Sequence, residues 1–280
     1  MTHPLEAPEI HHRAAVLGSP IEHSRSPVLH NAGYEDLGMH DWEYTRIECT
    51  AEDLPRIVGE ADESFRGFSV TMPAKFAALQ FATEVTDRAR RIGSANTLVR
   101  TAAGWRADNT DCDGITGALT ELLGERLTDT RRALVIGGGG TARPALWALA
   151  NAGITDITVI NRSDRSAELA PVLEPFGVDV RFAGFDSDLR QASREAEVIV
   201  STVPSAAVAG HEQALGHAPI LDVIYEPWPT PLTVAAAANG FLTVGGHIML
   251  AHQAYGQFEQ FTGRPAPRTA MRRALEAALH

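Results

Sequence analysis

The feature that most constrains the fold is a run of four glycines, residues 137–140, directly after a short apolar stretch. Residues 134–136 read Leu-Val-Ile and predict a buried strand, and the alanine-rich residues 141–152 predict a helix. A strand, a glycine turn and a helix in this order open the βαβ unit of dinucleotide-binding folds. The sequence therefore predicts a parallel sheet with helices packed on its faces.

The spacing of the glycine turn fits the pattern G-x-G-x-x-A through Gly137, Gly139 and Ala142. Gly137 permits a tight turn, Gly139 lets the backbone approach a pyrophosphate, and Ala142 allows the helix to pack closely on the strand. The helix N-terminus then presents unpaired N–H groups to the anion. A glycine turn without a ligand is the alternative, but the flanking strand and helix favour a cofactor site.

The end of the next predicted strand, residues 156–160, indicates which cofactor is bound. An NAD site usually has Asp or Glu about 20 residues after the glycines, where it binds the ribose 2′-hydroxyl. Here that position reads Asn161-Arg162-Ser163, followed by Asp164 and Arg165. Because a guanidinium forms charge-assisted bonds to a 2′-phosphate, we expect NADP. Asp164 leaves NAD open, and an exposed surface arginine is the alternative interpretation of Arg162.

Strands and helices alternate along the whole chain, which predicts the α/β class with mostly parallel sheets. Predicted strands cover residues 14–18, 43–48, 67–71, 97–101, 134–136, 156–160, 179–182, 198–201 and 220–223. Predicted helices cover residues 27–37, 51–60, 73–81, 85–92, 141–152, 248–261 and 267–279, with no strand in the last stretch. The length of 280 residues favours two domains. Two arrangements are open. Either the two domains are consecutive in sequence, or the chain leaves the first domain near Asp111 and returns to it with its last two helices.

Charge and cysteine content narrow the classes of partner. The 24 Lys and Arg against 35 Asp and Glu give a net charge of −11 with no basic cluster, so nucleic acid and membrane surfaces are poor partners. No run reaches the length of a membrane span, and the N-terminus lacks the apolar core of a signal peptide. Cys49 and Cys112 read as free thiols of a cytoplasmic protein. The eleven histidines show no metal-ligand spacing, so no metal is expected.

A second informative segment is 18–31, where a glycine ends an apolar run and two prolines frame Ser24 and Ser26. Pro27 fits the first position of a helix, and Ser26 fits its N-cap. Two hydroxyls and a helix N-terminus together suit a small polar anion. The alternative is an ordinary capped helix in which Ser26 serves only the backbone.

Further polar residues stand at predicted strand ends. Thr71 and Lys75 follow the strand 67–71, Asn96 precedes the strand 97–101, and Asn109-Thr110-Asp111 follows a short extended piece. Ligands of open α/β sheets bind beside such strand ends. A solvated surface lysine is the alternative for Lys75 taken singly.

Together these motifs make the chain resemble the shikimate dehydrogenase family along nearly its whole length. The matching pieces are residues 18–31, Val70-Thr71-x-Pro73-x-Lys75, 93–97, Asn109-Thr110-Asp111, 137–141, Asn161-Arg162-Ser163, 222–227 with 230–232, and Met249-Leu250-x-x-Gln253-Ala254. The departures are Ser69, where the family more often has Asn, and Ser166, where a basic residue is common.

The resemblance implies a role for individual residues. Lys75 and Asp111 would form the catalytic pair, with Lys75 stabilising alkoxide charge and delivering a proton while Asp111 orients it. Residues implied to hold the substrate are Ser24, Ser26, Thr71, Lys75, Asn96, Asp111, Tyr225 and Gln253. Residues implied to line NADP are Asp87, Gly137, Gly138, Gly139, Gly140, Thr141, Asn161, Arg162, Ser163, Arg165, Ser166, Val223 and Gly246.

The resemblance also implies an architecture and a reaction. Residues 1–110 and 246–280 would form a substrate domain and residues 111–245 a Rossmann-type NADP domain, with a cleft that narrows on binding. The implied reaction is the NADPH-dependent reduction of 3-dehydroshikimate to shikimate in aromatic amino acid biosynthesis, by a monomer or homodimer. The alternatives are an NAD-using quinate/shikimate dehydrogenase, a methylenetetrahydrofolate dehydrogenase and a catalytically silent nucleotide-binding relative.

Overall fold

The computed structural model describes residues 9–279, and these residues divide by their internal contacts into two compact units. Within the described residues, the first unit comprises 9–90, 94–110 and 254–279, and the second comprises 91–93 and 111–253. The chain therefore returns to the first unit with its C-terminal residues. The sequence analysis predicted that the returning segment begins at residue 246. In the structure, Ile248 and Met249 still belong to the apolar core of the second unit.

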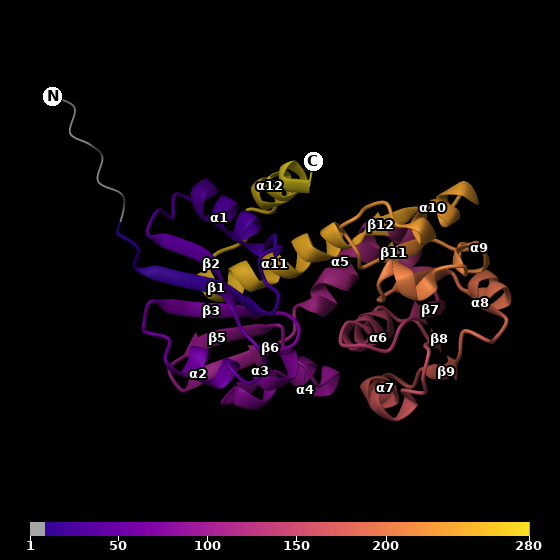
Figure 1. The fold of residues 1–280 in the computed structure, drawn as a ribbon, viewed down its shortest axis with the longest axis horizontal. Coiled ribbons are helices and arrows are strands. Elements are labelled where there is room, and N and C mark those ends of the chain that lie inside the picture. Colours follow the sequence, from indigo (N-terminus) through magenta and orange to yellow (C-terminus); the bar gives the residue numbers. More distant parts are fainter. Residues whose placement is uncertain (1–8, 280) are drawn as a thin grey trace. The chain divides into compact units, whose positions relative to one another are not determined.

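The first unit contains a mixed six-stranded sheet in the order β2-β1-β3-β5-β6-β4 (Figure 1). Its strands are β1 (His12–Gly18), β2 (Trp42–Glu48), β3 (Phe65–Val70), β4 (Glu84–Val85), β5 (Thr97–Thr101) and β6 (Gly104–Asp108). The prediction of mostly parallel pairing is confirmed, and the exceptions are β3–β5 and β5–β6, which are antiparallel. Only Ala102 and Ala103 separate β5 from β6, and so short a connection forces a hairpin.

Helices cover both faces of this sheet. They are α1 (Ser26–Asp36), α2 (Leu54–Gly59), α3 (Lys75–Phe81), α4 (Asp87–Ile92), the later part of α11 (Gly246–Thr262) and α12 (Arg268–Leu279). Helices α2 and α3 pack on one face, in the apolar core around Leu17 and Phe68. Helix α11 packs on the other face, where Gly67 has no side chain and the ring of Phe261 occupies the space that a Cβ would fill.

The second unit contains an entirely parallel sheet in the order β12-β11-β10-β7-β8-β9. Its strands are β7 (Arg132–Ile136), β8 (Asp156–Ile160), β9 (Asp179–Ala183), β10 (Val198–Ser201), β11 (Ile220–Asp222) and β12 (Thr243–Gly245). This is the Rossmann order, which reverses between β7 and β10. The prediction of an α/β fold with a Rossmann-type half is confirmed. Strand β12 was missed because it has only three residues, one of them Gly245, and so carries too little pattern.

Helices flank the parallel sheet, and its central strands, such as β7 and β10, are buried on both faces. The helices are α5 (Asp111–Leu123), α6 (Ala142–Asn151), α7 (Ser166–Leu173), α8 (Leu189–Glu195), α9 (Glu212–Leu215) and α10 (Pro231–Ala238). Val135 belongs to one apolar core, whereas Leu134 and Ile136 belong to the other. Alternation of side chains along the strand thus explains why 134–136 is a continuous apolar run.

Several predicted boundaries shift by a few residues. Helix α3 begins at Lys75 rather than at Pro73, and Val85 lies in the short strand β4 rather than in a helix. Such shifts are ordinary at the ends of elements. Among the described residues, no helix has both the length and the apolar character that a membrane crossing requires.

Candidate functional site

One edge of the first unit's sheet carries most of the predicted substrate residues. The parallel strands β1, β3 and β6 end there, followed by Ser24, Thr71 and Asn109-Thr110. Strand β5 runs the opposite way, so Asn96, which precedes it, lies at the same edge. The backbone N–H of Val70 donates to the carbonyl of Asn96 at 2.7 Å. The mixed topology, which the sequence did not predict, is what places Asn96 beside the other groups.

The two serines of the 18–31 segment lie together. The Ser24 and Ser26 hydroxyl oxygens are 3.3 Å apart, and the Arg46 guanidinium fixes the Ser24 carbonyl with bonds of 2.9 and 2.6 Å. The prediction that Ser26 is the N-cap of α1 is wrong. Helix α1 begins at Ser26 itself, and its cap residue, Arg25, makes no side-chain cap bond. The hydroxyl of Ser26 therefore does not serve the helix backbone.

Thr71 is held against the end of β1. Its backbone N–H donates to the carbonyl of Leu17 at 2.8 Å. Its methyl group occupies the space that a Cβ on Gly18 would fill. Gly18 is thus required for the close approach of the segment that leads from Thr71 to Lys75.

Lys75 is the first residue of α3, and its carbonyl accepts a hydrogen bond of 3.0 Å from the Ala95 N–H. Its backbone therefore lies beside the segment that carries Asn96. Lys75 is also the only lysine among the 24 Lys and Arg residues of the chain. The sequence reasoning overlooked this signal. A chain that uses arginine at every other cationic position retains here the one side chain that can readily release a proton.

Asp111, the other predicted catalytic residue, is the first residue of α5 and is buried. Its carboxylate lies in the first turn of that helix, where the helix dipole favours negative charge. By its contacts Asp111 belongs to the second unit and Lys75 to the first. Their assignment as a pair therefore stays a proposal.

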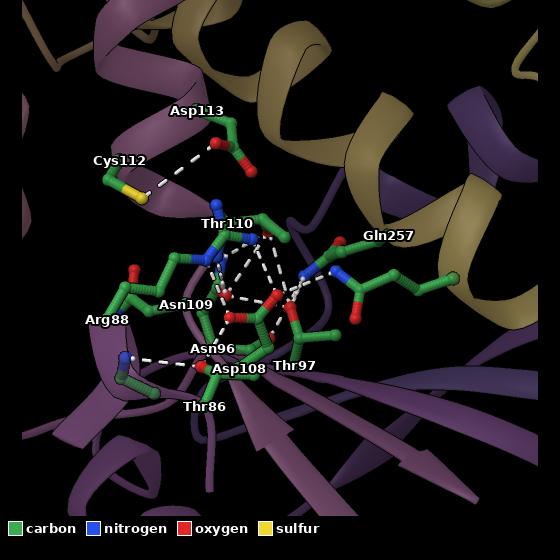
Figure 2. Close-up of polar contacts among 12 residues, drawn as sticks. Thr86, Arg88, Asn96, Thr97, Asp108, Asn109, Thr110, Cys112, Asp113 and Gln257 are labelled. Carbon is green, nitrogen blue, oxygen red and sulfur yellow. Dashed lines mark hydrogen bonds and ion pairs between the residues drawn. The ribbon is translucent and has the colours of Figure 1, made fainter.

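Asn96 is buried inside a tight polar cluster (Figure 2). Its Oδ1 accepts from the Thr110 N–H at 2.7 Å and from the Thr97 hydroxyl at 2.8 Å. Its Nδ2 donates to the Thr110 hydroxyl at 3.0 Å. The amide orientation is thereby fixed, because a backbone N–H can only donate.

Asp108, at the end of β6, anchors the segment that leads to Asp111. Arg88 binds both of its carboxylate oxygens, the Thr86 hydroxyl donates at 2.7 Å, and Gln260 Nε2 donates at 2.8 Å. Burial alone would raise the pKa of Asp108, but the bonds from Arg88 outweigh it and lower the pKa to about 2. No sequence motif identified this ion pair, because Arg88 and Asp108 meet only through the fold.

The glycine turn of the second unit forms an open backbone cradle after β7. Gly137 has φ +108°, and a Cβ there would lie 2.5 Å from Thr202 Oγ1, so only glycine fits. Cβ atoms on Gly139 or Gly140 would meet nothing within 4 Å. Thr202 follows β10, so the turn lies at the reversal of strand order, where Rossmann folds bind their ligands.

The residues predicted to bind a 2′-phosphate gather around one cavity of about 500 Å³ after β8. Its lining consists of Val159, Asn161, Arg162, Ser163, Asp164, Arg165, Ser166, Phe182, Ala183 and Gly184. The Asp164 carboxylate accepts from the Ser166 N–H at 2.8 Å, and this bond lowers its pKa. Asp164 is therefore engaged by the loop itself. A Cβ on Gly138 would lie 2.9 Å from Asn161 Nδ2, which places Asn161 next to the glycine turn.

The remaining predicted residues are more dispersed. Gly246 begins α11, and the carbonyl of Val223 occupies the space of its Cβ, so these two predicted cofactor residues meet. Tyr225 follows β11, and Gln253 Nε2 donates to the Leu250 carbonyl at 3.1 Å. Asp87 lies in the first unit, exposed and paired with Arg90, and its assignment to the cofactor stays a prediction. Residues 9–279 contain no cluster of three or more potential metal ligands.

Three family models match the chain. "Shikimate dehydrogenase substrate binding domain" matches residues 16–98, "Shikimate / quinate 5-dehydrogenase" matches 121–219, and "Shikimate 5'-dehydrogenase C-terminal domain" matches 246–276. The first and third matches fall mainly on the first unit, and the middle match falls within the second.

Solved and curated relatives agree with these models. The crystal structure of Mycobacterium tuberculosis shikimate dehydrogenase is 53% identical, with a TM-score of 0.89, and the match covers 95% of this chain and 99% of that one. Shikimate dehydrogenase (NADP(+)) of Methylobacterium radiotolerans is 38% identical over 268 residues, 91% of this chain and 93% of the relative. The Thermus thermophilus shikimate 5-dehydrogenase solved with NADP(H) and shikimate is 30% identical, with a TM-score of 0.80 and coverage of 95% and 99%.

Some relatives are much longer. The pentafunctional AROM polypeptide of Saccharomyces cerevisiae is 34% identical over 271 residues. The match takes in 90% of this chain and spans only 17% of the length of that polypeptide. The similarity therefore concerns one portion of a multifunctional protein.

Proposed function

The chain belongs to the shikimate dehydrogenase family, and on this premise we propose that it catalyses the NADP-dependent interconversion of shikimate and 3-dehydroshikimate. We further propose that reduction to shikimate is the physiological direction, in the cytoplasm, as a step of aromatic biosynthesis. The observation that carries the proposal is the clustering of Ser24, Ser26, Thr71, Lys75 and Asn96 at one sheet edge.

The chemistry of that edge suits a polyol carboxylate. Ser24 and Ser26 lie 3.3 Å apart and can both donate to a carboxylate. Asn96, whose Oδ1 is engaged by Thr110 and Thr97, presents its amide as a donor to a substrate hydroxyl oxygen.

The second unit fits a dinucleotide, and its loop after β8 favours NADP over NAD. Gly139 and Gly140 leave open backbone for a pyrophosphate, and α6 begins directly behind them. Arg162 and Arg165 line the adjacent cavity, and the only carboxylate there, Asp164, already accepts the Ser166 N–H. Arg165 is paired with Glu168 at 2.8 Å, so the guanidinium that we assign to the 2′-phosphate is that of Arg162. We therefore assign Gly137–Thr141, Asn161–Ser166, Val223 and Gly246 to NADP.

NADP, when bound, supplies or accepts the hydride. The protein's own task is then to manage charge and a proton on the substrate oxygen. In the reductive direction the Lys75 ammonium stabilises the developing alkoxide and gives it a proton. In the oxidative direction Lys75 takes that proton back. Asp111 orients Lys75, and Thr71, Tyr225 and Gln253 complete the contacts to the substrate.

The test is NADPH formation by the purified protein with shikimate or quinate, each supplied with NADP+ or NAD+. The proposal expects fast turnover with shikimate and NADP+, and loss of that turnover in Lys75→Ala. Preference for NAD+ or for quinate would move the chain to the quinate/shikimate dehydrogenases. Binding of NADP+ without turnover of either substrate would instead identify a silent relative.

A further inference from the structure

Gln257 is a buried amide of α11 that none of the predicted site roles includes. Its side chain is 1% exposed, and both ends of the amide are bonded. Nε2 donates to the Asn96 carbonyl at 3.0 Å and to the Thr97 hydroxyl at 3.1 Å, while Oε1 accepts from the Ser69 hydroxyl at 2.8 Å. Figure 2 shows Gln257 facing Thr97 and Asn96. A polar side chain in the core is tolerated only when it is bonded in this way.

The register of the sheet explains why these groups meet. Ser69 on β3 and Thr97 on β5 are direct cross-strand partners, so their side chains point to the same face. The α11 helix covers that face, since Phe261, one turn beyond Gln257, packs over Gly67. The α11 helix therefore covers the Ser69 and Thr97 hydroxyls at the position of Gln257.

Two backbone groups fix the direction of every hydrogen bond around Gln257. The Asn96 carbonyl can only accept, so the Gln257 NH2 faces it and the Gln257 Oε1 must face Ser69. The Gln257 NH2 also donates to Thr97, so the Thr97 proton is directed to Asn96 Oδ1. That oxygen receives the Thr110 N–H as well. The Asn96 amide is consequently locked with its NH2 as the group that can donate to a ligand.

The same chain of hydrogen bonds continues in the other direction to Tyr44. The Ser69 proton goes to Gln257, so the Ser69 oxygen accepts from the Tyr44 hydroxyl, at 2.6 Å. Tyr44 is buried, and burial raises the pKa of its phenol. A continuous path of hydrogen bonds therefore joins Tyr44 to Asn96 through Ser69, Gln257 and Thr97.

We propose that Gln257 is a positioning residue that holds one substrate-binding group, the Asn96 side chain, in place. The inference rests on the proposed function, in which Asn96 contacts shikimate. Gln257 does so because its one rigid amide accepts from Ser69 on β3 and donates both to the Asn96 carbonyl and to Thr97, which in turn donates to Asn96. Ser69, a departure from the family's usual residue, is its direct partner.

The test compares Gln257→Met with Thr262→Val. Thr262 lies on the same helix, but its hydroxyl donates to the Phe258 carbonyl of that helix at 2.8 Å, so it is outside the path. We expect Gln257→Met to raise the KM for shikimate about tenfold, because misplaced contact groups lose affinity and rate together. The KM for NADP+ should change less than about twofold, and Thr262→Val should leave both constants near the wild-type values.

A second variant covers the case in which Gln257→Met fails to fold. In Gln257→Glu the neutral acid can still donate toward the Asn96 carbonyl, whereas the ionised form repels it. Burial raises the pKa of such an acid, so the ratio of shikimate KM in the variant to that of wild type should fall as the pH drops from about 8 to about 6. A ratio near one at every pH would overturn the inference.

The proposed function and the role of Gln257 can be contradicted independently of each other. A wild-type protein that does not oxidise shikimate with NADP+ contradicts the proposed function. A wild-type protein that does so, with a folded Gln257→Met variant whose shikimate KM equals that of Thr262→Val, contradicts only the role of Gln257.

Discussion

The two units build their parts of the candidate site in different ways. In the first unit, side chains from distant parts of the chain are bonded inside the core, as when Ser69 donates to Gln257, 188 residues away. In the second unit, the loops use backbone and short-range bonds, such as Asn161 to the Ser163 carbonyl and Asp164 to the Ser166 N–H. The first site is therefore a property of the packed fold, and the second is a property of local sequence.

Because of this difference, the two sites should respond differently to mutation. A glycine turn offers backbone N–H groups whatever the neighbouring side chains are, provided that the turn can form. A buried chain of hydroxyls and amides depends on every member, because an unmatched polar group in the core costs about 1–3 kcal/mol. Substitutions in the first unit should act through side-chain orientation, and those in the second through backbone space and surface charge.

The largest expected effect concerns Lys75, whose ammonium is proposed to move the proton. Lys75→Met should lower kcat by roughly 10²- to 10⁴-fold, the usual contribution of a general acid–base group. Binding of NADP+, measured by calorimetry, should stay unchanged because the cofactor loops lie in the second unit. Lys75→Arg is the matched control, since it keeps the charge but does not release a proton. Recovery of Lys75→Arg to within about tenfold of wild type would show that charge alone suffices.

Two glycine substitutions test the different roles assigned to Gly137 and Gly139 in the second unit. In Gly137→Ala the new Cβ would meet Thr202 at 2.5 Å with φ +108°, so we expect a stability loss of roughly 2 kcal/mol. In Gly139→Ala nothing lies within 4 Å, so the melting temperature should hold while NADP+ affinity falls. Thermal melts and NADP+ titration distinguish the two. Equal melting temperatures for both variants would contradict the assignment of Gly137 to the turn.

The buried His30 makes the stability of the first unit depend on pH. Its ring stacks on Tyr44 with centroids 4.1 Å apart, and burial lowers its pKa to about 3. Because the unfolded chain binds the proton with a pKa near 6.5, stability is complete above that pH and is lost as the pH falls toward 3. At pH 5 the loss should be about 2 kcal/mol.

Hydrogen exchange read separately for peptides of each unit would measure this loss. His30→Leu should remove the pH dependence between about pH 6.5 and about pH 5 in the first unit only. An identical pH dependence in wild type and His30→Leu would mean that another group is responsible.

The smallest expected effect concerns the 2′-phosphate. Arg162→Ala should raise the KM for NADP+ about tenfold, the worth of one charge-assisted hydrogen bond, and leave turnover with NAD+ as it was. Arg181→Ala, which removes an arginine paired with Asp156 on the same sheet, is the control. A parallel loss with NADP+ and NAD+ would place Arg162 away from the 2′-phosphate.

The sequence predicted strand pairing in the second unit better than in the first, for a physical reason. Strands 156–160 and 198–201 of the second unit, and strand 97–101 of the first, were predicted with their observed bounds. The direction of β5 was not predicted, since period-2 patterns do not encode the direction of pairing. The cap of α1 was misassigned by one residue, because the helix begins at Ser26 itself.

The residues that sequence reasoning missed are those whose role exists only in three dimensions. Gln257, Tyr44 and the Arg88–Asp108 pair carry no motif, and their partners are 20 or more residues away. Ser69 was noticed only as a departure from the family. The uniqueness of Lys75 among the lysines, by contrast, was available from composition alone.

The central claim is that the first unit binds shikimate and the second binds NADP+. Its most direct test is calorimetric titration of each ligand into two variants, Asn96→Asp and Arg162→Ala. Asn96→Asp keeps an oxygen for the Thr110 N–H and replaces the NH2 donor by a second, negatively charged acceptor oxygen. The account predicts a crossed result, in which Asn96→Asp weakens only shikimate and Arg162→Ala weakens only NADP+. Equal weakening of both ligands in either variant would contradict it.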